Sequence, residues 1–442
     1  MRNTQDAQTS SKVRRLSRVV AVPVATSTLL LTGLFTSAPV AAAAPARPAS
    51  FPSGAVFNTP RNAGGSTANQ YKWHNYVTSM INGTPKGAAI NISTYSWDHP
   101  ASLAALTAAD ARGVRVRLVL WEERAKSPEI IQLSQALNDG QTPGSYLKTC
   151  NGSCLGPASG DVGVHHAKIF TFSEVLTPAG PVKYVSTFGS ANLTATNAAY
   201  SFNLSHIVQN DKKIYTALNS YIALMPADKD QRTETVRTVS SGPYVLYLYP
   251  QRSYQSDLIL ETLNSTGCKA PRGFGAKGRT SVRVAMFSWS YGRVKIAKRL
   301  VRLQRAGCNV GVILTNDVSA GRVDQRVLEV LIKGKVPTWN GYRVRANQTQ
   351  VYQHSKTLIV DGAVGGRGQK LTFAGSANWT RNALDTNAET IVRVKSSAEY
   401  LTWWSVCKLS SDRLRRVPPP LDWRNRPIIR VPGEELEEPT SR

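Results

Sequence analysis

Apolar and polar positions along the chain predict strands and helices in alternation. Short apolar runs rich in β-branched residues predict strands at 89–95, 114–120, 244–249 and 310–314. Apolar residues at helical spacing, ended by a glycine or a polar turn, predict helices at 69–81, 103–112 and 293–306. The last of these carries five lysines and arginines on one face, which we interpret as its solvent-exposed side.

The same pattern occurs twice, which predicts an internal duplication. In each copy a strand, a helix and a second strand precede an apolar run with His-x-Lys, and Gly-Ser-Ala-Asn follows. The matched residues are His166 with His354, Lys168 with Lys356, Ser190 with Ser376, and Asn192 with Asn378. A single His-x-Lys is common by chance, but two copies with matched downstream asparagines are not.

Each His-x-Lys lies in an apolar run that is typical of a strand. Side chains alternate in direction along a strand, so a histidine and a lysine two residues apart face the same side. His165 then faces away from His166, and we take His166 as the chemically relevant histidine.

The N-terminal residues 1–44 read as a cleaved signal peptide. Four basic residues between 12 and 18 precede a mostly apolar run at 19–35 and small residues at 38–44. We expect cleavage within 41–44 and a secreted protein. The alternative is a retained N-terminal anchor, which the proline and hydroxyl residues within the apolar run disfavour.

The boundary between the two copies is expected in the polar segment 226–242. The first half then covers 45–235, the second half covers 240–410, and a Pro-rich, acidic tail covers 411–442. A stretch rich in Gly and Ser at 139–162 is predicted as a long loop before the first His-Lys strand. Such a loop either overhangs the site or is an inert insertion.

The chain carries a net charge of +26, and about +22 remains without residues 1–44, which hold five basic residues and one acidic residue. This balance favours an anionic partner such as a phospholipid surface, a nucleic acid or a teichoic-type polymer. A solvated basic surface that aids solubility is the alternative.

Export permits disulfides among the five cysteines. The spacing suggests Cys150 with Cys154 and Cys268 with Cys308, leaving Cys407 free, although sequence alone does not fix this connectivity. The histidines are not spaced with the cysteines as zinc ligands would be, so no metal site is expected.

Two imidazoles, two ammonium groups and two asparagine amides around one cavity suit a phosphodiester. Lysines and amides can hold the non-bridging oxygens and stabilise developing charge without a metal or another cofactor. One neutral histidine can attack phosphorus, and the other can protonate the leaving alcohol and later deprotonate the incoming water or alcohol. A single chain supplies every group, so a monomer suffices.

These motifs resemble those of the phospholipase D superfamily, whose signature is His-x-Lys with an aspartate five residues later and then Gly-Ser-x-Asn. The second copy matches in full and includes Asp361, whereas Ser173 stands at the aspartate position of the first copy. The resemblance covers residues 57–400. It implies two tandem α/β halves, with mixed sheets flanked by helices and related by a pseudo-twofold axis, and a phosphohistidine intermediate.

The resemblance also implies a role for each site residue. The first-half histidine, His166, is expected as the nucleophile and His354 as the general acid and base. Counting 11 residues past each asparagine gives Glu389, expected to support His166 across the interface, and Asn203, expected to face His354. We assigned Ser190 and Ser376 to phosphate binding, and Asp361 to a supporting role.

Three functions compete at this point. The first is a secreted phospholipase D that acts on glycerophospholipids at a membrane or micelle surface. The second is a metal-independent nuclease of the same superfamily, which the positive charge also fits. The third is a catalytically weak basic binding protein, which the non-acidic residues Ser173 and Asn203 favour.

Overall fold

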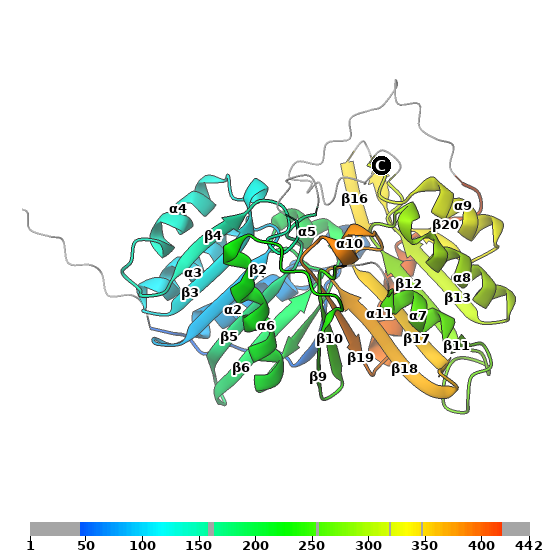
Figure 1. The fold of residues 1–442 in the computed structure, drawn as a ribbon, viewed down its shortest axis with the longest axis horizontal. Helices are drawn as coiled ribbons and strands as arrows, with labels where there is room; N and C mark the ends of the chain where they lie inside the picture. The colour runs from blue at the N-terminus through cyan, green and yellow to red at the C-terminus, as the bar shows by residue number, and fades with distance from the viewer. Residues whose placement is uncertain (1–44, 158–162, 253–255, 318–319, 346–347, 418–442) are drawn as a thin grey trace, which may run out of the picture. The chain divides into compact units, whose positions relative to one another are not determined.

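Two mixed sheets account for most of the strands in the computed structural model (Figure 1). The structure describes residues 45–157, 163–252, 256–317, 320–345 and 348–417. The predicted signal peptide and most of the predicted tail lie outside these residues. By their contacts, the described residues belong to one compact unit.

The first sheet has seven strands in the order β1-β8-β6-β5-β2-β3-β4. Their bounds are β1 Gly54–Phe57, β8 Leu204–Val208, β6 Gly180–Gly189, β5 Ile169–Thr177, β2 Ala89–Thr94, β3 Arg115–Trp121 and β4 Tyr146–Cys150. Neighbours from β1 to β2 pair antiparallel, and the β2-β3 and β3-β4 pairs are parallel.

The second sheet repeats this topology in the order β10-β19-β18-β17-β12-β13-β14. The bounds are β10 Tyr244–Tyr249, β19 Glu389–Val394, β18 Arg367–Gly375, β17 Lys356–Val364, β12 Ser281–Met286, β13 Asn309–Leu314 and β14 Thr338–Asn340. Every pair has the same direction as its counterpart in the first sheet. The sequence duplication is therefore a duplication of the fold.

Short strands extend the second sheet and form a small third one. β9 (Arg237–Ser241) continues the sheet beyond β10, β20 (Asp412–Leu414) pairs with β14, and β11 (Thr266–Gly267) pairs with β17. β20 lies past the predicted end of the second half at 410. The third sheet joins β15 (Arg343–Arg345), β16 (Gln348–Gln353) and β7 (Ser201–Phe202), which belongs to the first half.

Helices cover the outer face of each sheet. In the first half α2 (Lys72–Gly83), α3 (Pro100–Ala111) and α4 (Pro128–Leu137) pack on one apolar core, and α7 (Leu258–Asn264), α8 (Val294–Arg305) and α9 (Gln325–Lys333) do so in the second. The apolar side of α8 is buried, and Lys295, Lys298 and Arg302 are exposed, so the predicted solvent face is confirmed.

A third core joins the two halves. It contains residues from the inner faces of both sheets, such as Phe188 and Ile359, together with side chains of α6 (Lys212–Leu224) and α11 (Ala398–Leu409). Burial of this shared apolar surface is the main force that brings the two copies together. None of the described helices has both the length and the apolar character that a bilayer span requires.

One prediction about the first half was wrong, and one of its helices was not anticipated. The expected loop at 139–162 contains β4, which adds an edge strand parallel to β3. The helix α4 was not predicted, although Ser127 caps it by accepting a hydrogen bond from the backbone of Ile130 and Pro128 occupies its first turn. Only three residues of this helix are buried, Ile130, Leu133 and Leu137. So few apolar positions made the helical period hard to detect.

Candidate active site

His166 is held by both halves of the molecule. It lies just before β5, and its backbone N–H donates a 3.1 Å hydrogen bond to the carbonyl of Ala388 in the second half. Its Nδ1 lies 2.8 Å from Oε1 of Glu389, the first residue of β19, and both side chains are fully buried. A proton on Nδ1 that is donated to this carboxylate leaves Nε2 as the nitrogen for chemistry.

The Glu389 carboxylate remains ionised in this buried place. Burial alone would raise its pKa, but the charges of His166 and Lys168 and the hydrogen bonds from His166 and Ser376 outweigh burial and lower the pKa. The side-chain amide of Asn387 adds a 3.3 Å hydrogen bond to Oε1. An ionised carboxylate here stabilises positive charge on the imidazole of His166.

His354 occupies the related position in the second half, with a neutral partner. Its backbone N–H donates to the carbonyl of Phe202 at 3.1 Å, and its Nδ1 lies 2.7 Å from Oδ1 of Asn203. Nδ2 of Asn197 lies 3.3 Å from the same nitrogen. Asn203 therefore faces His354, as the count of 11 residues past Asn192 predicted. Its amide, however, carries no charge to stabilise an imidazolium.

The two motif lysines are buried beside their histidines. Nζ of Lys168 donates to the carbonyl of His166, and Nζ of Lys356 donates to that of His354, each at 2.8 Å. The same ammonium groups lie 5.0 Å from the ring centre of Tyr95 and 4.8 Å from that of Phe287. Two ammonium charges held in a water-poor site favour an anionic ligand.

The motif asparagines are fully buried as well. The backbone N–H of Asn192 donates to Oδ1 of Asn197 at 2.9 Å. Within the described part of the chain, neither the oxygen nor the nitrogen of the Asn378 side-chain amide has a hydrogen-bond partner. A buried amide in this state costs free energy, so it fits a site whose ligand supplies the missing partners.

The hydroxyls of Ser190 and Ser376, which the sequence predicts to bind phosphate, make hydrogen bonds within the protein. The Ser376 hydroxyl donates to Oε2 of Glu389 and accepts from the backbone N–H of Thr390. The Ser190 hydroxyl donates to Oδ1 of Asn203 at 3.0 Å and accepts from the backbone N–H of Leu204. Each hydroxyl proton is therefore used to orient the residue that supports the histidine of the other half.

Asp361 and Ser173 perform the same local task in the two halves. Asp361 accepts hydrogen bonds of 2.8 Å from the backbone N–H of Gly275 and from the hydroxyl of Ser397. Ser173 accepts a 2.8 Å hydrogen bond from the backbone N–H of Ala89. Both side chains tie a strand to a neighbouring segment, so serine at 173 keeps part of the aspartate's structural function.

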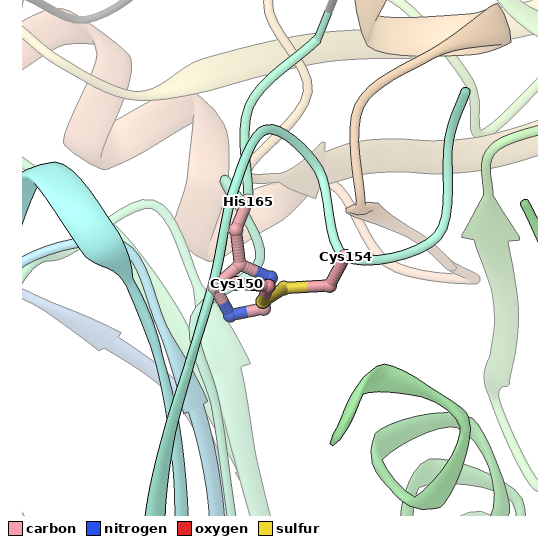
Figure 2. Close-up of side chains that lie close together, drawn as sticks. All are labelled: Cys150, Cys154 and His165. Atoms are coloured by element: carbon pink, nitrogen blue, oxygen red, sulfur yellow. A yellow bond between two sulfur atoms is a disulfide. The ribbon is translucent and has the colours of Figure 1, made fainter. Parts of the chain in front are cut away.

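His165 faces away from the site, toward a disulfide (Figure 2). Its Nε2 lies 3.2 Å from the hydroxyl of Ser93, and burial lowers its pKa to about 3, so it stays neutral. His165, Cys150 and Cys154 form a group of three potential metal ligands, but the sulfurs are bonded to each other and offer no thiolate. The predicted pairing of Cys268 with Cys308 is also confirmed.

Several residues that support the site carry no recognisable motif in the sequence. Asn197 contacts His354, Asn192 and Asn203, and it has no matching asparagine in the second half. Asn387 links Glu389 to the backbone of Val164. The only available signal was their position near the motif, because single asparagines in turns are common.

Comparison with known proteins gives one family and several similar folds. A family model described as "Cardiolipin synthase, PLD-like domain" matches residues 78–225 and 276–405, which is more than half of the chain. The structure is similar to phosphatidylserine synthase of Haemophilus influenzae Rd KW20, with a TM-score of 0.53 and 10% identity over 79% of this chain and 86% of that one. No curated protein sequence matches the chain.

Two further structures are less similar. Polyphosphate kinase of Porphyromonas gingivalis has a TM-score of 0.46 and 14% identity over 77% of this chain, which spans 48% of the kinase. The phospholipase D family member Nuc of Salmonella typhimurium has a TM-score of 0.28 and 18% identity over 41% of this chain and 99% of Nuc. At these identities the likeness concerns the fold alone. By its sequence match over both halves, the chain belongs to the phospholipase D-like family of phosphodiesterases and phosphotransferases.

Proposed function

We propose that the chain is a phospholipase D-type enzyme that cleaves the head group from glycerophospholipids, or transfers the phosphatidyl group to another alcohol. The observation that carries the proposal is the buried pair of His166 and Glu389, which come from opposite halves and lie 2.8 Å apart. A neutral imidazole whose Nδ1–H is held by a carboxylate is a prepared nucleophile.

In the first step Nε2 of His166 attacks phosphorus, and the bond to the head-group oxygen breaks. The imidazole gains positive charge as the N–P bond forms, and Glu389 stabilises that charge. His354 donates a proton to the departing oxygen, so the head group leaves as an alcohol and not as an alkoxide. Lys168, Lys356 and the Asn378 amide hold the non-bridging oxygens.

In the second step a water or an alcohol replaces the head group. His354, now neutral, takes the proton of the incoming hydroxyl, whose oxygen attacks phosphorus as the N–P bond breaks. The product is phosphatidic acid when water attacks and a new phospholipid when an alcohol attacks. His166 returns to its neutral form with its Nδ1 proton still held by Glu389.

The different partners of the two histidines support this order of roles. The Glu389 carboxylate stabilises the cationic phosphohistidine, whereas Asn203 orients His354 without increasing its hold on a proton. An uncharged neighbour suits a proton donor, because His354 must release its proton during the reaction. Of the two histidines, His166 is therefore the better nucleophile.

We also propose that the protein is exported. Two disulfides among the described residues, Cys150–Cys154 and Cys268–Cys308, fit an oxidising compartment. Export also brings a chain that keeps a charge of about +22 without residues 1–44 to anionic lipid surfaces. Expression of the whole chain, followed by N-terminal sequencing of the protein in the medium, tests this. We expect a start between 42 and 45, and a start before Ser37 contradicts a cleaved signal peptide.

The lipid assignment is tested by a paired assay. Purified protein and its His166→Ala variant are incubated, with EDTA present, on phosphatidylcholine vesicles and on plasmid DNA. Release of choline that depends on His166 supports the proposal. Nicked plasmid without choline release indicates a nuclease, and inactivity on both indicates a binding protein.

A further inference from the structure

A buried ion pair lies behind the second-half asparagine. Nε and Nη2 of Arg293 donate to the two oxygens of Asp257 at 2.9 and 2.6 Å. The Arg293 side chain is fully buried, and that of Asp257 is 6% exposed. Asp257 also caps α7, because its Oδ1 accepts hydrogen bonds from the backbone of Ile259 and Leu260.

Arg293 connects this pair to the site. Its Nη1 donates a 3.3 Å hydrogen bond to the backbone carbonyl of Asn378, and its own carbonyl accepts one of 3.2 Å from the indole of Trp289. Trp379, the residue after Asn378, packs edge-on against Trp289 with ring centres 4.5 Å apart. The turn that carries the Asn378 amide is therefore held in place by the Arg293 guanidinium and by the indoles of Trp289 and Trp379.

The first half holds its motif asparagine with uncharged side chains. Trp97, the counterpart of Trp289, donates its indole N–H to the hydroxyl of Ser102 at 2.8 Å. Asn192, the counterpart of Asn378, donates its N–H to the side chain of Asn197, and the imidazole of His74, which burial keeps neutral by lowering its pKa to about 3, hydrogen-bonds to the backbone of Asn192. The buried charge behind the asparagine is thus particular to the second half among the described residues.

The presence of this buried pair is not explained by its contribution to the stability of the fold. Removing two charges from water costs several kcal/mol, and replacing a buried pair by uncharged residues of similar size is often neutral or stabilising. The planar guanidinium, however, makes two hydrogen bonds to Asp257 and a third to the Asn378 carbonyl in one fixed arrangement. We propose that Asp257 and Arg293 are positioning residues, which aim the Asn378 amide at a non-bridging oxygen of the phosphate. This inference rests on the proposed phosphodiesterase function.

The test is a cycle of variants. Asp257→Asn with Arg293→Met removes both charges at once, so neither is left buried alone, and asparagine at 257 still caps α7. This paired variant, Asn378→Ala, and their combination are compared with the unaltered protein. The probe is bis(p-nitrophenyl) phosphate, a small diester with one phosphate, and kcat and KM are measured for each protein.

We expect Asn378→Ala to lower kcat/KM about 10²-fold. The paired variant should lower it by about 10-fold to 10²-fold. In the Asn378→Ala background, the same paired change should cost less than about twofold, because the amide that it positions is gone. An equal loss in both backgrounds would mean a general structural role and would overturn the inference.

Two controls separate the possible failures. The partly exposed pair Asp230–Arg232, whose charged atoms lie 2.8 Å apart, receives the same Asn and Met replacements, and the kcat/KM of that variant should equal that of the unaltered protein. If the unaltered protein has no turnover that depends on His166, the proposed function fails. The four proteins of the cycle are then compared by their affinity for tungstate, a tetrahedral oxyanion. Non-additive losses of affinity support the positioning role, and additive losses refute it.

Discussion

His166 and Glu389 lie 223 residues apart in the chain, yet Nδ1 of one is 2.8 Å from Oε1 of the other in a site with no solvent exposure. The pair exists only when the two copies of the fold pack together. Assembly of the nucleophile therefore requires that the two folded halves pack against each other. A change that loosens the shared core is expected to lower activity before it unfolds either sheet.

Glu389→Gln tests the electrostatic contribution of the carboxylate. Glutamine keeps the size and can still accept from Nδ1, but it offers no charge to the imidazolium that forms during attack. We expect kcat on a phosphodiester to fall by about 10²-fold to 10⁴-fold, with little change in melting temperature. Glu329→Gln on α9 is the matched control, since its carboxylate pairs with Lys333 on the exposed helix surface. Equal kcat values for the two variants would contradict the role of Glu389.

Asn203→Asp tests the role of the neutral partner. A carboxylate at 203 stabilises protonated His354, so the alkaline limb of the kcat/KM profile should move upward by about one pH unit. The same change makes His354 a weaker acid, and the maximal rate should fall. Profiles on bis(p-nitrophenyl) phosphate measure both effects. An alkaline limb that stays in place would show that His354 does not supply the proton.

The duplication made most of this site predictable from sequence. Paired motifs identified His166, Lys168, His354 and Lys356, because a repeated pattern of chemically useful residues rarely arises by chance. Glu389 and Asn203 followed from the resemblance and a fixed count, since Glu389 begins β19 and Asn203 immediately precedes β8, each 11 residues past a motif asparagine. The matching strand orders of the two sheets explain why the matched residues have similar separations, 188 residues for the histidines and 186 for the asparagines.

Contacts made across space were not predictable. Asn197 and Arg293 act through partners 157 and 85 residues away, namely His354 and Asn378, and nothing in the local pattern marks them. The partners of the Ser190 and Ser376 hydroxyls were not predictable for the same reason, because sequence gives the residue but not the direction of its single proton. The strand β4 was missed because edge strands are short and partly polar.

Three buried histidines should make the protein less stable in acid. Burial is the main cause that lowers the pKa of His74, His165 and His206 from 6.5 to about 3. They stay neutral in the fold, whereas the unfolded chain takes up protons below pH 6.5. Stability is therefore full above pH 6.5 and falls as the pH drops toward 3, by about 2 kcal/mol per histidine between pH 7 and pH 5.

His206 allows this to be tested away from the site, because it pairs with the hydroxyl of Tyr400 in α11 at 2.8 Å. In His206→Gln, the loss of unfolding free energy between pH 7 and pH 5 should shrink by about 2 kcal/mol. Urea unfolding at the two pH values measures the difference. Parallel losses in both proteins would mean that His206 is protonated in the fold.

The Cys268–Cys308 disulfide should contribute to stability through the 40-residue separation that it closes. Replacing both cysteines by alanine should lower the unfolding free energy by about 3 to 4 kcal/mol, since the unfolded chain regains the entropy of the open loop. Thiol titration of the denatured, unreduced protein should find one thiol, Cys407. Three or five thiols would contradict the pairing.

Phosphate trapped on the enzyme gives the most direct test of the central claim. The protein is mixed with a phosphodiester that leaves a labelled phosphoryl group, quenched in alkali to preserve phosphohistidine, digested and mapped by mass spectrometry. We predict label on the peptide that contains His166, and no label after His166→Ala. Label on His354 in its place would reverse the roles of the two histidines, and turnover without label on either would contradict a covalent mechanism.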